Sequence, residues 1–243
     1  MRFADLISKV PSVQREGSAD AEVTAIADDS RKVGPGTLFV ARGGARADGG
    51  AFVADAIKRG AVAIVAAPGV AVPANMPVAR AVHPSLSAAH LAHAFHGFPA
   101  QQLRVAGVTG TNGKTTIAFL LQQCMAQAAQ KYGLIGTVLI DDGREKITSE
   151  LTTPGAIDLA ALLARMRDNG CVGVSMETSS HALDQGRVAG IDFAVGIFTN
   201  LSGDHLDYHG TMDKYADAKA KLFEDLATSA TAIVNADDPA YAR

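Results

Sequence analysis

The segment Thr109–Thr116, which reads Thr-Gly-Thr-Asn-Gly-Lys-Thr-Thr, has the residue types of a phosphate-binding loop. It lies between an apolar run at 103–108 and a helical pattern at 117–129. Glycines let the backbone turn so that its N–H groups converge on phosphate oxygens, and a helix N-terminus adds partial positive charge. Lys114 would reach the outer phosphates of a nucleotide, and the Thr115 hydroxyl would bind Mg²⁺. An ordinary glycine-rich turn is the alternative.

Two further polar segments follow apolar runs that predict buried strands. Glu177-Thr178-Ser179-Ser180-His181 follows 172–176, and the polar stretch 199–209 follows 193–198. The carboxyl ends of parallel strands meet at one edge of a sheet, where ligands gather. There Glu177 and His205 could hold Mg²⁺ against the phosphates, because oxygen ligands suit this ion and phosphoryl transfer needs charge neutralisation. Taken singly, each residue could equally be a solvated side chain at the rim.

The elements that position these residues are short apolar runs alternating with helical patterns. Strands are predicted at 37–41, 61–67, 76–82, 105–108, 132–140, 172–177, 193–198 and 231–235, and helices at 52–59, 86–95, 117–129, 157–168 and 212–226. This alternation favours an α/β fold with parallel βαβ units. Gly97-Phe98-Pro99 interrupts the pattern, so we predict two domains, 1–98 and 99–243.

The composition favours a soluble, cytoplasmic protein, and we expect it to be a monomer. The 243 residues are 48% apolar, and the charge balance is 22 − 25 = −3, which gives no reason to expect nucleic acid or an acidic membrane as partner. The longest apolar stretch, 61–74, contains two prolines and is too short to span a bilayer. His90, His93 and His96 share helical spacing, but no carboxylate motif accompanies them, so we predict surface or core histidines rather than metal ligands.

The chain resembles the Mur ligases throughout its length and in the same order. The resemblance rests on Thr109–Thr116, Thr152-Thr153-Pro154, Met176–Leu183 and Asp204-His205-Leu206-Asp207-Tyr208-His209-Gly210. The last two segments are most similar to the members that add the third amino acid of the peptidoglycan peptide. Asp29-Ser30-Arg31, 35–41 and Ala47-Asp48-Gly49 are similar to the uridine-nucleotide domain of these ligases. The resemblance implies a small UDP-MurNAc-binding domain followed by a P-loop ATPase domain with a parallel sheet.

The same resemblance implies roles for individual residues. ATP would be bound by Gly110, Thr111, Asn112, Gly113, Lys114, Thr115 and Thr116. Ser30 and Arg46 would contact the uridine diphosphate, and the rest of the UDP-MurNAc-dipeptide would be held by Thr152, Thr153, Ser179, Gln185 and Arg187. A planar guanidinium such as that of Arg187 suits a carboxylate. Mg²⁺ would be bound by Thr115, Glu177, His205 and Lys219, with Lys219 carbamylated, because a carbamate turns a cation into an anionic oxygen ligand. Lys114 and Lys219 would be the catalytic residues.

The implied reaction is ATP-dependent amide-bond formation. ATP would phosphorylate the carboxylate of the dipeptide, and a diamino acid, meso-diaminopimelate or lysine, would attack the acyl phosphate. Family members are longer and carry a third domain for the amino acid, so we expect this chain to be the first half of an enzyme and inactive alone. The alternatives are another Mur-type or folylpolyglutamate-type ligase, a P-loop kinase or GTPase, and a non-catalytic nucleotide-binding fragment.

Overall fold

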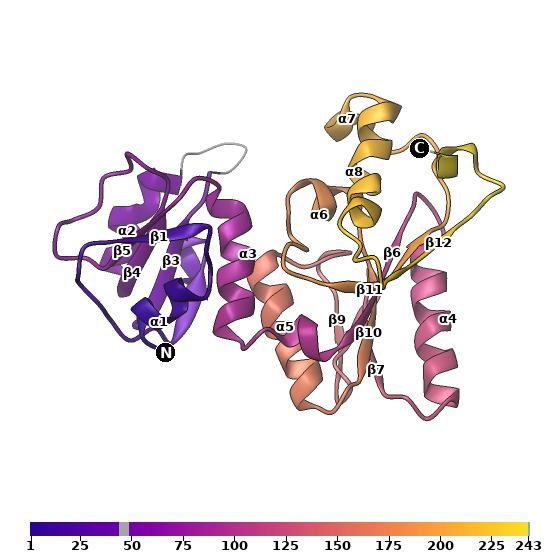
Figure 1. Cartoon of the computed structure of the whole chain (residues 1–243), viewed down its shortest axis with the longest axis horizontal. Helices are drawn as coiled ribbons and strands as arrows, with labels where there is room; N and C mark the ends of the chain where they lie inside the picture. Colours follow the sequence, from indigo (N-terminus) through magenta and orange to yellow (C-terminus); the bar gives the residue numbers. More distant parts are fainter. Residues whose placement is uncertain (44–48, 243) are drawn as a thin grey trace. The chain divides into compact units, whose positions relative to one another are not determined.

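The computed structural model describes residues 1–43 and 49–242, which form two compact units, Met1–Gly97 and Phe98–Arg243 (Figure 1). Each unit contains its own sheet. The chain leaves the first unit through two consecutive left-handed residues, Gly97 (φ 72°) and Phe98 (φ 54°), which end the preceding helix. Arg46 and the Ala47-Asp48 pair lie outside the described residues.

The first unit has a five-stranded sheet in the order β1-β5-β4-β3-β2. Its strands are β1 (Val13–Glu16), β2 (Ala25–Ala27), β3 (Thr37–Ala41), β4 (Ala61–Ala66) and β5 (Val78–Ala81), and its helices are α1 (Phe3–Ser8), α2 (Val53–Lys58) and α3 (Pro84–Phe95). The four strands β2 to β5 are parallel, and β1 pairs antiparallel with β5. Val53 and Ala56 of α2 pack with Phe39 and Ile64 in a core on the sheet.

The second unit has a seven-stranded sheet in the order β12-β11-β6-β10-β7-β8-β9. These strands are β6 (Arg104–Thr109), β7 (Tyr132–Ile135), β8 (Leu139–Asp141), β9 (Lys146–Thr148), β10 (Gly173–Glu177), β11 (Phe193–Phe198) and β12 (Thr231–Val234). The five strands from β12 to β7 run parallel, whereas β8 and β9 extend the sheet as an antiparallel hairpin. The strand before the predicted phosphate loop, β6, is therefore the middle one of the five parallel strands, between β11 and β10.

Helices cover both faces of this sheet (Figure 1). They are α4 (Lys114–Gln127), α5 (Ala156–Asp168), α6 (Ser180–Asp184), α7 (Leu206–His209) and α8 (Met212–Glu224). The larger core joins Val105 and Val174 of the strands to Leu163 of α5, Ala182 of α6 and Leu222 of α8. The smaller core joins Val108 to Ala118 of α4 on the opposite face. Successive strand side chains thus serve two layers, as expected for a parallel sheet buried on both sides.

The predicted α/β fold with mainly parallel strands is confirmed, but one predicted strand is wrong. Residues 132–140 do not form a single strand, because the chain turns back after β7 and the N–H of Gly136 donates to the carbonyl of Leu139 at 3.2 Å. The short helices α1, α6 and α7 were not predicted, since four to six residues are too few to show a helical period. Within the described residues, no helix combines the length and the apolar character needed to cross a membrane.

Candidate nucleotide and substrate site

The predicted phosphate loop follows β6 and leads directly into α4. Gly110 (φ 144°) and Gly113 (φ 85°) adopt backbone conformations that side chains disfavour, and a Cβ on Gly110 would lie 1.9 Å from Thr199 Oγ1. Helical hydrogen bonding begins with the N–H of Ile117 to the carbonyl of Gly113. The backbone N–H groups of the first turn, Lys114 among them, therefore lack acceptors inside the helix and are suited to bind an anion.

The segment that follows β11 clamps this loop. The N–H of Thr111 donates to the carbonyl of Asn200 at 2.8 Å, and the N–H of Asn112 donates to Asn200 Oδ1 at 3.0 Å. The hydroxyl of Thr199 and the amide of Asn200 both donate to the carbonyl of Asn112, at 2.6 and 3.1 Å. Sequence analysis did not single out Asn200, because an asparagine within a polar loop carries no periodic signal.

Two lysines meet at the carbonyl oxygen of Gly110. Lys114 Nζ donates to the carbonyls of Gly110 and Thr111 at 2.8 and 2.7 Å, and Lys219 Nζ donates to Gly110 at 2.8 Å. Lys219 is 3% exposed and lies over the ring of Tyr215. Burial, and secondly the charge of Lys114, lowers the pKa of Lys219 to about 7. A large fraction of this amine is therefore neutral near pH 7, and the neutral amine is the form that can attack carbon dioxide.

Glu177 closes β10 at the same edge of the sheet and is 1% exposed. The N–H of Thr137 donates to its Oε1 at 2.8 Å, and the Thr137 hydroxyl donates to its Oε2 at 3.1 Å. Thr137 was not among the residues predicted from the sequence, because the single strand expected at 132–140 would have placed it inside a regular sheet. The actual turn brings it onto the carboxylate.

The residues predicted to hold the acceptor substrate form one network beside Glu177. The hydroxyl of Thr153 donates to the carbonyl of Glu177 at 2.9 Å, and the N–H of Ser179 donates to that hydroxyl at 3.1 Å. Arg187 donates to the carbonyl of Thr153 at 3.1 Å and to Gln185 Oε1 at 2.6 and 2.9 Å. Thr152 lies 3.0 Å from the Thr137 hydroxyl. Thr153 is buried and its hydroxyl is occupied within the protein, so it orders the network.

His205 stands at the start of α7 in a left-handed conformation (φ 53°), with its side chain 47% exposed. Its ring packs edge-on against His181, with ring centroids 4.8 Å apart. His209, one turn later, is buried, and its Nε2 lies 3.0 Å from Ser180 Oγ. The α6 and α7 segments are therefore joined by side chains that hold His205 at the rim.

Most of the predicted site residues of this unit line one cavity of about 240 Å³, but Gly110, Thr116, Thr153, Gln185 and Arg187 are not part of its lining. Its lining includes Thr111, Asn112, Gly113, Lys114, Thr115, Thr137, Thr152, Glu177, Ser179, His205 and Lys219. In the described chain, no three His, Cys, Asp or Glu side chains are grouped so as to hold a metal by themselves. Mg²⁺ does not require such a cage, because it keeps several waters and binds one or two carboxylates together with substrate phosphates. One buried carboxylate beside a hydroxyl and a phosphate-binding loop fits that ion.

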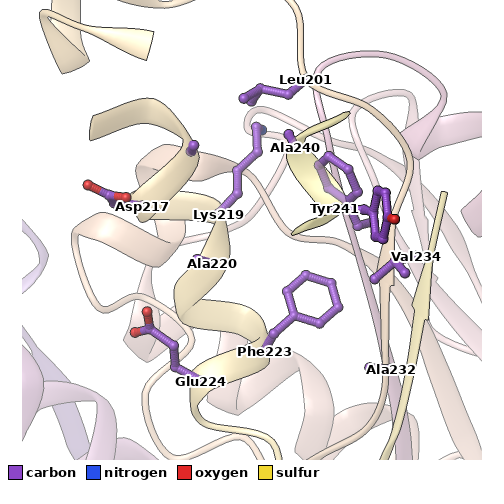
Figure 2. A pocket seen from close by; sticks show the side chains of 12 residues that line it. Leu201, Asp217, Lys219, Ala220, Phe223, Glu224, Ala232, Val234, Ala240 and Tyr241 are labelled. Carbon is purple, nitrogen blue, oxygen red and sulfur yellow. The ribbon is translucent and has the colours of Figure 1, made fainter. Parts of the chain in front are cut away.

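Lys219 also borders a second, more apolar cavity of about 520 Å³ between α8 and β12. Figure 2 shows Phe223 reaching from α8 toward Val234 and Lys219 running toward Leu201 and Ala240, while Asp217 and Glu224 point away. Tyr241 belongs to the short 3₁₀ segment η4 (Pro239–Ala242). This cavity offers little polar chemistry apart from the lysine.

In the first unit, Ser30 lies at a separate cavity of about 440 Å³. It is 7% exposed and begins the 3₁₀ segment η1 (Ser30–Lys32), which Asp29 caps by accepting the N–H of Arg31. Arg31 and Arg42 also line this cavity, each paired with a lining carboxylate, Asp29 and Asp28 respectively. Phe39 and Phe52 add an aromatic surface.

The chain matches two family models: the Mur ligase middle domain over residues 108–243, and the Mur ligase family catalytic domain over residues 22–103. The strand-to-helix loop on a parallel sheet, with polar residues at the neighbouring strand ends, agrees with these two matches. The chain belongs to the Mur ligase family.

Individual relatives show which member of the family this chain resembles. The chain is 44% identical to the UDP-N-acetylmuramoyl-L-alanyl-D-glutamate–2,6-diaminopimelate ligases of Chlorobium phaeobacteroides and Lactiplantibacillus plantarum, over 98% of this chain and 48% and 50% of theirs. A solved structure of a ligase with that name is 33% identical, with a TM-score of 0.74 over 89% of this chain and 44% of that one. MurF from Acinetobacter baumannii, 19% identical with a TM-score of 0.65 over 97% of this chain and 49% of its own, shares the fold. The chain thus spans about half the length of the curated relatives it matches.

Proposed function

We propose that this chain provides the UDP-MurNAc-binding domain, residues 1–98, and the ATP-binding domain, residues 99–243, of a UDP-N-acetylmuramoyl-tripeptide synthetase. The observation that carries the proposal is the gathering of strand-end residues from β6, β10 and β11 around one cavity. The 44% identity to diaminopimelate-adding ligases supports the UDP-MurNAc-dipeptide as the substrate that is extended. It also favours diaminopimelate over lysine as the added amino acid. The setting would be the bacterial cytoplasm.

In this proposal the loop amides and Lys114 bind the phosphates of ATP and stabilise the charge that develops on the transferred group. Arg187 and Ser179 orient the terminal carboxylate of the dipeptide, which attacks the γ-phosphorus, displaces ADP and forms an acyl phosphate. The amine of the diamino acid then attacks the acyl carbon, and inorganic phosphate leaves. Ser30 holds the uridine end of the substrate.

Mg²⁺, held by Thr115, Glu177, His205 and carbamylated Lys219, would neutralise phosphate charge. Neutral Lys219 Nζ attacks carbon dioxide, forms an N–C bond and loses one proton to solvent. The pKa of about 7 supports this step, because the amine is largely neutral in mildly alkaline solution. Burial makes the Lys219 ammonium costly here. A carbamate at this position would be stabilised because its negative charge is balanced by the bound Mg²⁺.

The test is mass spectrometry of the products formed from ATP, Mg²⁺, UDP-MurNAc-L-Ala-D-Glu and either diaminopimelate or lysine. The protein is this chain joined after Arg243 to the C-terminal half of the Lactiplantibacillus plantarum relative, with the chain alone as comparator. We expect the tripeptide product from the fusion, none from its Lys114→Ala variant, and none from the chain alone. Products only from UDP-MurNAc-tripeptide or a folate would instead indicate another ligase of this class.

A further inference from the structure

The carboxylate of Glu177 is held by a single residue of the turn between β7 and β8. An ionised carboxylate at 1% exposure requires hydrogen bonds to offset its lost hydration. Thr137 supplies one to each oxygen, from its N–H at 2.8 Å and from its hydroxyl at 3.1 Å. This two-point contact fixes both the position and the plane of the carboxylate.

The turn is shaped for this contact. A Cβ on Gly136 would lie 2.4 Å from Glu177 Oε1, so glycine allows the backbone to approach the carboxylate closely. The N–H of Gly136 donates to Leu139, which closes the turn and aims Thr137 at Glu177. Thr137 is itself exposed, so it contributes little to the core and its side chain is free to serve the site.

We propose that Thr137 is a positioning residue that sets the orientation of Glu177 for Mg²⁺–nucleotide binding. The inference rests on the proposed function and assigns this role to a residue outside the set predicted from the sequence. The Thr137 hydroxyl is directed at both Glu177 Oε2, at 3.1 Å, and Thr152 Oγ1, at 3.0 Å, and its single proton favours the carboxylate, which is the stronger acceptor. Its β-branched side chain has few rotamers, which keeps the hydroxyl in place.

Thr137→Val removes the hydroxyl, keeps the shape and leaves the backbone N–H. We would titrate the chain with AMP-PNP by calorimetry at a series of MgCl₂ concentrations and with EDTA. Loss of a group that orients a metal ligand typically weakens metal binding by about 10-fold or more. The Mg²⁺ concentration for half-maximal nucleotide binding should therefore rise about 10-fold, while the affinity for nucleotide in EDTA stays unchanged.

Two further variants and one control complete the experiment. Thr137→Ser keeps the hydroxyl and should restore most of the Mg²⁺ dependence, whereas Gly136→Ala should mimic Thr137→Val by displacing the carboxylate. Thr148→Val, at an exposed position of β9, is the matched control and should behave as wild type. Thermal unfolding of each variant checks that the fold is retained.

An unchanged Mg²⁺ dependence in Thr137→Val would overturn the positioning role while leaving the proposed function intact. Equal weakening with and without Mg²⁺ would also overturn it, because it would show a general effect on the loop. If wild type bound AMP-PNP without any dependence on Mg²⁺, the proposed function would fail first and this inference with it.

Discussion

Lys219 is a buried lysine, and burial makes its charged form costly. The pKa of its amine is lowered from 10.5 to about 7, first by burial and then by Lys114. The folded protein therefore releases this proton near pH 7, whereas the unfolded chain keeps it until about 10.5. Because the unfolded state binds more protons in that interval, the free energy of unfolding should rise with pH by at most ~1.4 kcal/mol per pH unit.

Lys219→Met should flatten this rise between pH 7 and pH 9, as measured by urea unfolding in buffer free of carbon dioxide. Lys221→Met is the matched control, since Lys221 lies on the same helix but is only half-buried and is paired with Asp184. A variant at 219 that kept the full pH dependence would show that Lys219 is not the group responsible.

His93 is a second buried titratable group, and it belongs to the first unit. It is 2% exposed, and neither ring nitrogen has a hydrogen-bond partner among the residues that the structure describes. Burial lowers the pKa of His93 to about 4, with smaller contributions from His90 and His96. His90 and His96, which share its helical spacing, are only partly buried.

His93→Leu should therefore make the protein less sensitive to acid. Between pH 6.5 and pH 4 the unfolded chain binds the His93 proton and the folded chain does not, so wild type loses stability as the pH falls. The variant has no such proton and should lose less, by about 1 kcal/mol or more over this range. Identical acid unfolding curves for variant and wild type would show that His93 does not contribute to the acid sensitivity of the fold.

At the scale of elements, the phosphate loop depends on the close approach of two strand ends. Gly110→Ala adds a Cβ that would lie 1.9 Å from Thr199 Oγ1, at a φ of 144° that alanine disfavours. The loop should shift and AMP-PNP binding should fall at least 10-fold, since two or more loop hydrogen bonds would be lost. Gly203→Ala, with open space around it, is the control. Equal nucleotide affinity for both variants would refute the role of Gly110.

The sequence was sufficient to predict the long apolar strands and the helices between them, and hence which strand ends meet. Glu177, His205 and the loop could be placed together on that basis. Thr137 and Asn200 could not, because each acts through a turn or loop whose direction depends on tertiary contacts rather than on periodicity. The antiparallel β8–β9 hairpin was missed for a similar reason, since three-residue strands leave almost no pattern.

At the scale of the whole molecule, β12 is an exposed edge with an apolar cavity beside it. All four of its residues are exposed, Ile233 by 49% and Val234 by 43%, and the cavity of about 520 Å³ opens between it and α8 (Figure 2). Such an edge can pair with another chain. We expect concentration-dependent association in sedimentation velocity experiments, reduced in Ile233→Lys. A monomer at all concentrations would show that the edge is protected in solution.

The central claim is that this chain recognises a UDP-MurNAc-dipeptide through the terminal carboxylate of its D-glutamate, which UDP-MurNAc-L-Ala lacks. The most direct measurement is calorimetric titration of the chain with UDP-MurNAc-L-Ala-D-Glu and with UDP-MurNAc-L-Ala, in wild type and in Arg187→Ala. Wild type should bind the dipeptide about 10-fold more tightly, the value of one charge-assisted hydrogen bond, and Arg187→Ala should lose this preference. Equal affinity of wild type for the two ligands, or binding of neither, would contradict the account.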